Sequence, residues 1–490
     1  MQFERKGNPA IRKDGSEFDL GVFMPKYFLV PMELIDTHRA EPEVFTDIEN
    51  ALIVTKKNQM KYLRWFVNPD DRKYVETMGQ FLKKEGYDHS LHIYPGEQLD
   101  EQLGYRSASR SSLIVPVEKN LKPFFYKSST NNTAGHWSDK KVNGNQVRKA
   151  VISTQLSNRV RWDYIPDSNL VTFKEPVGYV IEDSILNQHG LDQGIVFRDF
   201  GEYGNDDRRQ LIPGFTIIHE TMGPEIAAKN SKHKNANKPS EYWKEFYAIP
   251  FGKASADFIF LHQLQVSSNH SQQYLIQIDK NFRPKKEFFF RDFNDSDYLT
   301  SMWTSPVHKE FRRQWMIDYS ATKLEFVFGL FKGSELPSWM KGYRVDDWAK
   351  ASLQAFEKRF SHNLGVSVRD LKASRMSCSM NMGNTINRYR TCSYNLNDPI
   401  FEKWVKAADC FKGEKETQFG LSCKKVLSCF KMSKKQLRKR FRCRNINKAL
   451  MLDRNLKSFN WKQFLKLGRN KSNNCNYNDN GLSVFVDRMP

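Results

Sequence analysis

The stretch from Asn269 to Asn294 most constrains the fold, because it contains a buried strand, a turn and a second strand in close succession. In residues 274–279 apolar side chains occur on both faces, which is the pattern of a strand that is covered on both sides. Residues 281–286 carry the Asn, Arg and Pro of a turn, and residues 287–290 form a second apolar run. We therefore predict a β-hairpin around which the rest of the chain is organised.

Polar residues at the ends of this hairpin form the first candidate site. His270, Gln272 and Gln273 precede the first strand, and Arg291 and Asp292 follow the second. A hairpin brings these side chains to one edge, where they suit a phosphorylated ligand held together with a metal ion. A hairpin whose polar ends simply face water is the alternative interpretation.

This stretch resembles the signature of the siderophore synthetases that act independently of nonribosomal peptide synthetases, the NIS family, of the aerobactin-synthetase type. In that family a Glu-Ala-His-Gly-Gln-Asn run leads into a strand, a turn with Gly-Arg-Pro or similar, and a strand that ends in Arg-Asp. The matching positions here are His270, Gln272, Arg283-Pro284 and Arg291-Asp292. Ser268 stands in place of the leading Glu, and Gln273 in place of the final Asn.

A second segment continues the resemblance. The family carries Ser-x-Arg-Thr before a strand, and a Lys and a Thr further along. In this frame the chain has Ala108-Ser109-Arg110-Ser111, so that Ala108 replaces the first Ser and Ser109 is adjacent to it, and Lys122 and Thr130 fall at the later positions. Ala134 falls where the family has an Arg, so that contact is lost or supplied by another base such as Lys127 or Arg148. Hydroxyls with Arg and Lys on neighbouring strands suit a triphosphate, although a polar hairpin with ordinary surface bases also fits.

Two further segments match more weakly. Residues 7–15 resemble the family's Gly-His-Pro-x-His-Pro-x-x-Lys segment, but Asn8 and Ile11 stand at the two His positions. The resemblance therefore implies a chain that is divergent and shortened in its N-terminal region. Residues 198–200 repeat the Arg-Asp-Phe of residues 291–293, and no other residues repeat at that spacing.

The resemblance implies an α+β fold, with a central, mostly antiparallel sheet shaped like a palm and a helical C-terminal lobe shaped like a thumb. It implies a reduced N-terminal region in residues 1–100, a palm-like ATP- and carboxylate-binding domain in 101–300, and a helical, basic domain in 301–490. We predict helices in residues 70–84, 308–331, 346–360, 399–408, 423–441 and 447–467 from their apolar spacing and end signals. The polar loop in residues 230–240 is expected to separate two lobes.

The implied reaction is the ATP-dependent condensation of a polycarboxylate, often citrate or a citryl derivative, with an amine or alcohol through an acyl-adenylate. The implied site residues are His270, Arg291 and Asp292 for catalysis, and Ser109, Arg110, Ser111, Lys122, Thr130, His270, Gln272 and Gln273 for ATP. Asp292 would hold Mg2+, and His270 would donate to the α-phosphate or the carboxylate. The departures at Asn8, Ser268 and Ala134 leave a non-catalytic relative as an alternative.

The charge of the chain points to anionic partners, and most of it is concentrated in one segment. Residues 421–470 hold 16 Lys and Arg against one acid, Asp453, whereas the whole chain has a formal net charge of +21. This segment could neutralise substrates above the active site, bind nucleic acid or a membrane surface, or be a solvated face. A homo-oligomer is also left open.

The remaining sequence features concern the compartment. We see no apolar run that could span a membrane and no signal peptide, so a cytoplasmic location is expected. All seven Cys lie between Cys378 and Cys475, with no CxxC pair. Reduced thiols are therefore the favoured interpretation, and a zinc cluster is the alternative.

Overall fold

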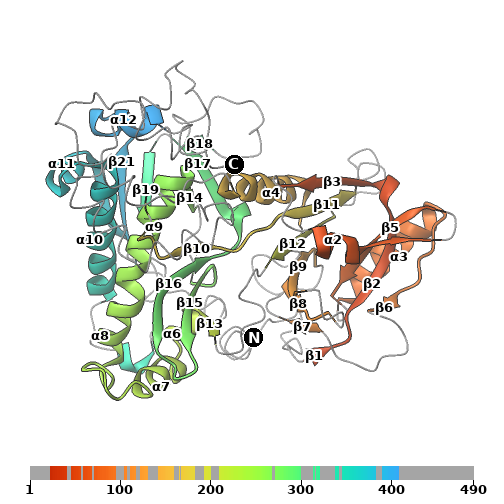
Figure 1. The fold of residues 1–490 in the computed structure, drawn as a ribbon, viewed down its shortest axis with the longest axis horizontal. Helices are drawn as coiled ribbons and strands as arrows, with labels where there is room; N and C mark the ends of the chain where they lie inside the picture. Colours follow the sequence, from red (N-terminus) through yellow and green to blue (C-terminus); the bar gives the residue numbers. More distant parts are fainter. Residues whose placement is uncertain are drawn as a thin grey trace, which may run out of the picture.

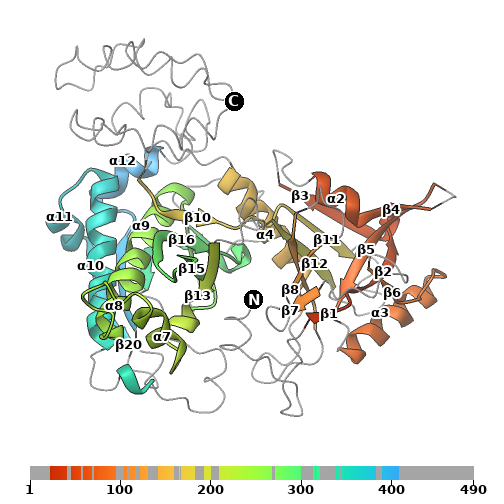
Figure 2. The same ribbon diagram turned by 60° about the horizontal axis from the view of Figure 1, so that its bottom comes forward.

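The computed structural model describes residues 22–40, 46–56, 59–68, 71–94, 104–106, 111–116, 122–130, 142–158, 165, 167–181, 193–199, 209–266, 271–299, 313–314, 316–320, 337–340, 345–381 and 389–407 of the 490-residue chain. These residues form an α+β fold of helices and mostly antiparallel sheets, as predicted. Two lobes lie side by side in Figures 1 and 2, one coloured red to orange and the other green to blue. No helix within these ranges is long and apolar enough to cross a membrane.

The N-terminal lobe is built on two antiparallel sheets. Their strand orders are β1-β7-β8-β9-β12-β11-β3 and β4-β5-β2-β6. The strands are β1 (Val22–Phe23), β2 (Lys26–Pro31), β3 (Ile35–Arg39), β4 (Ile53–Thr55), β5 (Lys61–Val67), β6 (His92–Ile93), β7 (Gly104–Arg106), β8 (Ser111–Ile114), β9 (Phe124–Ser128), β11 (Val177–Ile181) and β12 (Gly194–Asp199). The helices are α2 (Thr46–Leu52), α3 (Arg72–Lys84) and α4 (Gly144–Asn158), with the short turn η1 (Met32–Leu34).

The C-terminal lobe contains the predicted hairpin and most of the helices. Its sheets have the orders β10-β16-β15-β13, β14-β17-β18 and β19-β21-β20. The strands are β10 (Leu170–Thr172), β13 (Arg209–Pro213), β14 (Leu264–Val266), β15 (Tyr274–Asp279), β16 (Pro284–Phe290), β17 (Ser296–Leu299), β18 (Arg313–Gln314), β19 (Met316–Ser320), β20 (Arg375–Asn381) and β21 (Tyr389–Asn395). The helices and short turns are α6 (Gly214–Ile217), α7 (Met222–Ala228), α8 (Pro239–Trp243), η4 (Lys244–Ala248), α9 (Ile249–His262), η5 (Phe293–Asp295), η9 (Ser338–Met340), α10 (Val345–Leu364), α11 (Val368–Ala373) and α12 (Pro399–Ala407).

The hairpin of β15 and β16 is confirmed. The two strands pair antiparallel with Tyr274 opposite Phe290, and the carboxylate of Asp279 accepts hydrogen bonds from the backbone N–H groups of Asn281 and Arg283 in the turn. Strands β13 and β10 extend the sheet on either side, so both hairpin strands are interior ones. This position explains why apolar residues occupy both faces of residues 274–279.

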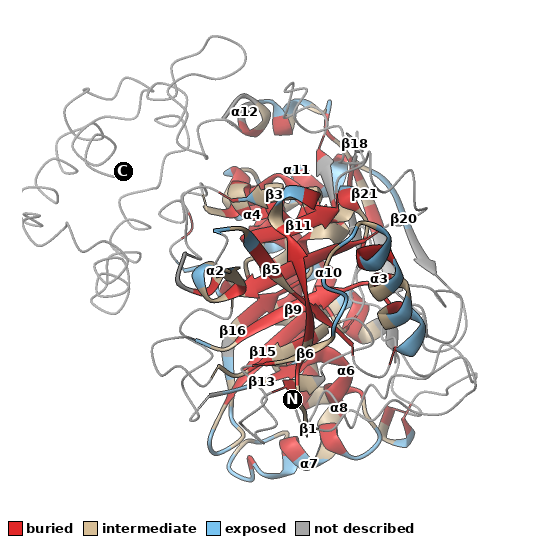
Figure 3. Ribbon diagram, turned by 90° about the vertical axis from the view of Figure 1, so that its right-hand side faces the viewer, coloured by how far each residue is buried: buried red, intermediate tan, exposed pale blue. Residues whose placement is uncertain are grey.

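Most of the buried apolar residues in the described part of the chain belong to two hydrophobic cores. One draws its buried side chains from residues 27–197, and the other from residues 156–404. Buried residues line the strands, while the outward faces of α3 and α7 are exposed (Figure 3). The proposed domain boundaries at residues 100 and 300 stay a prediction.

Helix α4 packs closely on the seven-stranded sheet because two glycines permit it. A Cβ atom at Gly178 would lie 2.4 Å from a methyl group of Val147, and one at Gly194 would lie 2.6 Å from the other methyl group. Real Cβ atoms do not approach other atoms so closely, so any larger residue at either position would push the helix away from β11 and β12. The helix therefore packs at a distance from the sheet that only glycine at these two positions allows.

Three predicted helices are confirmed, and a fourth is wrong. Helices α3, α10 and α12 occupy the ranges expected from their spacing. Residues 316–320, which we expected inside a helix, form strand β19 and pair antiparallel with β21, so that Met316 lies opposite Asn395. The apolar spacing of residues 308–331 was misleading because an edge strand with a buried residue such as Ile317 can carry a similar density of apolar side chains. Residues 423–441 and 447–467 lie outside the described residues.

The polar loop in residues 230–240 does not separate two lobes, which corrects our expectation. It connects α7 to α8 within the C-terminal lobe, and the side-chain amide of Asn230 donates a hydrogen bond of 2.8 Å to the backbone oxygen of Phe282 in the hairpin turn. The chain passes between the sheets of the two lobes at residues 173–176, between β10 and β11. That crossing is short and buried, so composition gave no sign of it.

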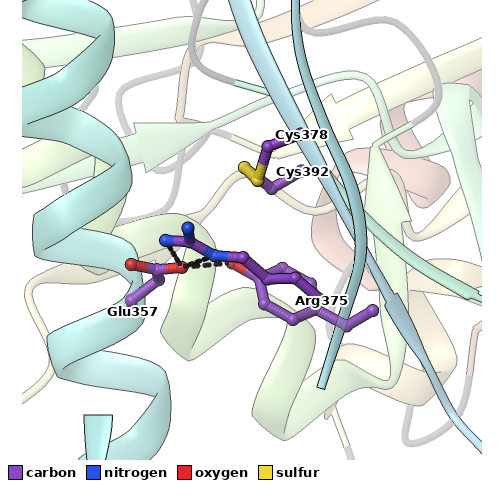
Figure 4. Close-up of a disulfide and its surroundings, with 5 residues drawn as sticks. Glu357, Arg375, Cys378 and Cys392 are labelled. Carbon is purple, nitrogen blue, oxygen red and sulfur yellow. Dashed lines mark hydrogen bonds and ion pairs between the residues drawn. A yellow bond between two sulfur atoms is a disulfide. The ribbon is translucent and has the colours of Figure 1, made fainter. Parts of the chain in front are cut away.

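The interpretation of reduced thiols is also wrong for two cysteines. Cys378 on β20 and Cys392 on β21 lie opposite each other in the strand register and form a disulfide (Figure 4). Nearby, Oε1 of Glu357 on α10 accepts hydrogen bonds from Nε of Arg375, at 2.6 Å, and from the hydroxyl of Tyr394, at 2.8 Å. Strand pairing brought the two thiols together, and their separation of 14 residues does not reveal it.

Candidate functional site

Two cations lie on one face of the seven-stranded sheet. Lys127 on β9 is directly opposite Ser111 on β8 and, on the other side, opposite Val196 on β12. Arg198 lies two residues beyond Val196, and so it shares this face. Helix α4 packs on the neighbouring strands β12, β11 and β3, and the side chains of Lys127 and Arg198 are 9% and 7% exposed. These cations are therefore held close to the protein interior.

The hairpin of the other lobe supplies an acid. After β16 ends, the backbone N–H of Arg291 donates to the carbonyl of Gln273 at 3.0 Å, and its Nε donates to the carbonyl of Gln272 at 2.9 Å. The chain then turns at Asp292, whose φ of +80° lies in the left-handed region. Asp is one of the few residues other than Gly that tolerate this region, at a cost of about 1–3 kcal/mol.

The two sets of residues meet at the junction of the lobes. Nζ of Lys127 donates to Oδ1 of Asp292 at 2.6 Å and to Oδ1 of Asn294 at 3.0 Å. The guanidinium of Arg198 lies 4.0 Å from the same carboxylate oxygen of Asp292. Cations from β9 and β12 thus converge on oxygens of the hairpin end, and the Asp292 side chain stays 21% exposed. We name the group of Lys127, Glu175, Arg198, Asp292 and Asn294 the junction site.

Glu175 is the buried acid of the junction site. It lies in the crossing between β10 and β11 and its side chain is 1% exposed. Its Oε1 accepts hydrogen bonds from Nε of Arg198, at 3.2 Å, and from a terminal nitrogen of the same guanidinium. Its Oε2 accepts a hydrogen bond of 3.1 Å from the backbone N–H of Phe293. The buried charge of Arg198 is therefore offset within the protein.

A cation of the same crossing has a shifted pKa. Burial lowers the pKa of the Lys174 ammonium, and the nearby Asp199 carboxylate partly opposes this effect. The carbonyl of Lys174 accepts the backbone N–H of Asp199 at 3.0 Å, which ties the crossing to the end of β12.

A second polar contact lies beside the hairpin end. Nε2 of Gln273 donates to Oδ2 of Asp295 at 2.5 Å. Gln273 is 1% exposed, and its Oε1 has no hydrogen-bond partner within the described part of the chain. A buried amide oxygen of this kind is an acceptor that a donor group could satisfy.

The structure brings together several of the residues expected from the sequence. Those at or beside the junction site are Ser111, Gln272, Gln273, Arg291 and Asp292. Lys122 is exposed ahead of β9. Thr130 is buried, and its hydroxyl donates to Oδ2 of Asp71, the residue that caps α3, at 2.5 Å. Its role in holding ATP stays a prediction.

Other expected residues lie outside the described residues. They are Ser109, Arg110 and His270, the departures Asn8, Ser268 and Ala134, and the basic segment in residues 421–470. Their roles, including nucleic-acid binding through the basic segment, stay predictions.

Sequence reasoning missed Glu175 and Asn294 and did not place Arg198 among the site residues. Lys127 was considered only as one substitute for a missing Arg. One signal was available, because Lys127 follows three aromatic residues and is the single charged residue in strand β9, where all five residues are buried. A charged residue in such a strand needs a partner, and this marks it as a candidate for a buried contact.

The oxygens of the hairpin end fit Mg2+. Carboxylate and amide oxygens are the donors that Mg2+ prefers, and Asp292 Oδ1 and Asn294 Oδ1 already converge on one cation, the Lys127 ammonium. The described residues contain no cluster of three His, Cys, Asp or Glu side chains that could hold a metal ion. A site of this kind suits Mg2+ that takes its other ligands from phosphate groups and water.

The chain matches no family model and no curated protein sequence. It is similar in structure to the petrobactin biosynthesis protein AsbB from Bacillus anthracis str. Sterne, with a TM-score of 0.48 and 15% identity over 69% of this chain and 61% of that one. Aerobactin synthetase IucA from a hypervirulent Klebsiella pneumoniae pathotype is similar with a TM-score of 0.44 and 10% identity over 75% of this chain and 68% of that one. The ATP-bound form of aerobactin synthetase IucA from the same source is similar with a TM-score of 0.42 and 11% identity over 76% of this chain and 69% of that one.

This chain thus spans 61% of the length of the petrobactin protein. Aerobactin synthetase is also the type of enzyme that the sequence motifs resemble. At TM-scores below 0.5 the likeness carries no conclusion about activity, which has to be inferred from the residues of the junction site.

Proposed function

We propose that this protein is an ATP-dependent synthetase that activates a polycarboxylic acid, such as citrate, as an acyl-adenylate and joins it to an amine or alcohol, as in siderophore biosynthesis. The contact between Lys127 and Asp292 carries this proposal. It joins the face of β8 and β9 to the Arg-Asp end of the hairpin, and these are the two segments in which the sequence resembles the synthetases.

The cations of the junction site suit a reaction between two polyanions. A polycarboxylate and a triphosphate repel each other, and a nucleophilic carboxylate oxygen reaches the α-phosphorus only where that repulsion is offset. Lys127 and Arg291 would bind phosphate or carboxylate oxygens, as Arg and Lys commonly do. Ser111, opposite Lys127 in the sheet, would add a hydroxyl donor.

The remaining polar groups would orient the reactants. Asp292 and Asn294 would hold Mg2+, which would offset the negative charge of the phosphate groups. Gln272, Gln273 and His270 would position ATP, with the buried Oε1 of Gln273 as an acceptor. Holding two reactants in line lowers the activation barrier of such a step by up to roughly 7–11 kcal/mol. The amine or alcohol would then displace AMP.

Pyrophosphate release tests this function. The purified chain is mixed with ATP, Mg2+ and each member of a panel of polycarboxylates, citrate first, with hydroxylamine as a trap for the acyl-adenylate. We expect release that depends on the acid and a hydroxamate of the same acid. Folded protein that releases no pyrophosphate with any acid would contradict the proposal.

A matched control separates the site from background hydrolysis. Lys127→Met keeps the length of the side chain but removes the ammonium, so acid-dependent release should fall to background. Lys73→Met on the exposed face of α3 should behave as the unchanged protein. Equal activity in all three proteins would place the chemistry elsewhere.

A further inference from the structure

Glu175 joins three elements that belong to different parts of the fold. It lies in the crossing between β10 and β11, and its own backbone N–H donates to Oγ1 of Thr154 on α4 at 2.8 Å. Its carboxylate binds Arg198 on β12 through one oxygen and the N–H of Phe293 in η5 through the other. Both carboxylate oxygens are therefore engaged, and the side chain is 1% exposed.

The contact with Phe293 holds a strained part of the hairpin end. Phe293 directly follows Asp292, whose φ is +80°, a conformation that most side chains avoid. The N–H of Asp295 donates to the carbonyl of Asp292 at 3.2 Å, and Oγ of Ser153 donates to the carbonyl of Phe293 at 3.4 Å. A strained residue persists only where its surroundings hold it, and the hydrogen bond that the Phe293 N–H donates to the charged Glu175 carboxylate is the strongest of these contacts.

The contact between Glu175 and Arg198 influences which of two cations, Arg198 or Lys127, binds the Asp292 carboxylate. Arg198 lies 4.0 Å from Asp292 Oδ1, while Lys127 lies 2.6 Å from the same oxygen. Without the Glu175 charge, the guanidinium, which is 7% exposed, would still have the Asp292 carboxylate within 4.0 Å. Arg198 would then compete with Lys127, and with Mg2+, for that carboxylate.

We propose that Glu175 is a positioning residue, which sets the conformation of Asp292 through Phe293 and fixes the place of Arg198 beside the Asp292 carboxylate. Its consequence for nucleotide binding rests on the proposed function, whereas its hold on residue 293 does not. Nothing in its sequence neighbourhood, Phe173-Lys174-Glu175-Pro176, marks it as part of a site.

The test replaces Glu175 by Gln and compares it with a matched buried acid. Glu357 also accepts hydrogen bonds from an Arg and lies 1% exposed, but it is in the C-terminal lobe on α10. Glu175→Gln keeps the size of the side chain but cannot accept from both Arg198 and Phe293, because its amide nitrogen is a donor. Glu175→Gln and Glu357→Gln are each compared with the unchanged chain by thermal unfolding, amide hydrogen exchange and calorimetric titration with ATP and Mg2+.

We expect both variants to lose thermal stability, since each disturbs a buried ion pair. Only Glu175→Gln should speed exchange of the Phe293 amide, by roughly tenfold or more for a lost bond to a charged group, and weaken ATP binding to a similar degree. Unchanged exchange at Phe293 in Glu175→Gln would overturn the inference. So would equal weakening of ATP binding by Glu357→Gln.

Two further outcomes are distinguishable. If the unchanged chain binds no ATP, the proposed function fails, while exchange at Phe293 still decides the role of Glu175. If Glu175→Gln does not fold, Thr154→Val provides the second variant, because it removes only the acceptor for the Glu175 N–H. It should speed exchange at residues 175 and 293, and unchanged exchange at both would overturn the inference.

Discussion

Nζ of Lys127 lies 2.6 Å from Oδ1 of Asp292, although 165 positions separate the two residues in the chain. The contact joins strand β9 of one lobe to the end of the hairpin in the other. Only 9% of the Lys127 side chain and 21% of the Asp292 side chain are exposed, so the pair is screened little by solvent. This contact defines where we expect the chemistry to occur.

Replacing Lys127 should reveal which lysine serves the site. Lys127→Met is expected to weaken binding of ATP with Mg2+ by about tenfold or more, because a charge-assisted contact is lost. Lys122→Met should have a smaller effect, since Lys122 is exposed ahead of β9. Calorimetric titration of the two variants measures the difference. A larger loss in Lys122→Met would restore the assignment made from the sequence.

Replacing Asp292 by Asn should preserve the fold but abolish the activity. Asn adopts the left-handed conformation as readily as Asp, so Asp292→Asn is expected to leave the circular dichroism spectrum nearly unchanged, while loss of the ion pair with Lys127 lowers the unfolding temperature. It removes the charge that Lys127 pairs with and that would hold Mg2+, so pyrophosphate exchange should be abolished. Exchange at the level of the unchanged chain would remove Asp292 from the site.

Thr130 should matter for stability and not for ATP. Its buried hydroxyl donates to Asp71, which in turn accepts the N–H of Tyr74 and caps α3. Thr130→Val removes this hydrogen bond to a buried carboxylate, and we expect a loss of about 1–3 kcal/mol in the free energy of unfolding. Urea unfolding measures the loss, and calorimetry should give an unchanged affinity for ATP. Weaker ATP binding with unchanged stability would favour the role expected from the sequence.

The disulfide between Cys378 and Cys392 should be detectable chemically. Alkylation of the denatured, unreduced chain should leave these two cysteines unlabelled, and peptide mass spectrometry can locate them. Replacing both by Ser is expected to lower the free energy of unfolding by about 2–4 kcal/mol, because the cross-link restricts the unfolded chain. Full labelling of both residues without a reductant would contradict the pairing.

Stability should fall at alkaline pH because several phenols ionise late in the folded chain. Burial, and then the charge of Glu357, raises the pKa of Tyr394, while a hydrogen bond to Glu33 raises the pKa of Tyr87 to about 12 from an ordinary value of 10.0. In the unfolded chain these groups lose protons near pH 10, so above that pH the unfolded state binds fewer protons than the folded state. The free energy of unfolding should therefore decrease as the pH rises through 10 towards 12.

Phenolate absorbance and chemical unfolding at a series of pH values measure this effect. Tyr394→Phe removes one of the phenols and should reduce the slope of stability against pH in that window. A slope that is the same in both proteins would show that Tyr394 ionises normally.

Local pattern predicted the elements whose burial is set by neighbours in the chain. The hairpin of β15 and β16, helix α3 with its end near Gly86, and helix α10 all follow from spacing and turn chemistry. Strand β19 was missed because its partner β21 lies about 75 residues further along, and strand pairing at that distance leaves no local pattern.

The sequence by itself determined the hairpin and the position of Arg291 and Asp292 at its end, and it predicted the class of ligand that such groups suit. These depend on side-chain period and on residue chemistry, which are local properties. Only the tertiary structure decided that Lys127 and Arg198 face Asp292 and that Glu175 holds both Arg198 and Phe293. The physical reason is that a buried charge is stable only beside a partner, and the partner is supplied by whichever lobe packs against it.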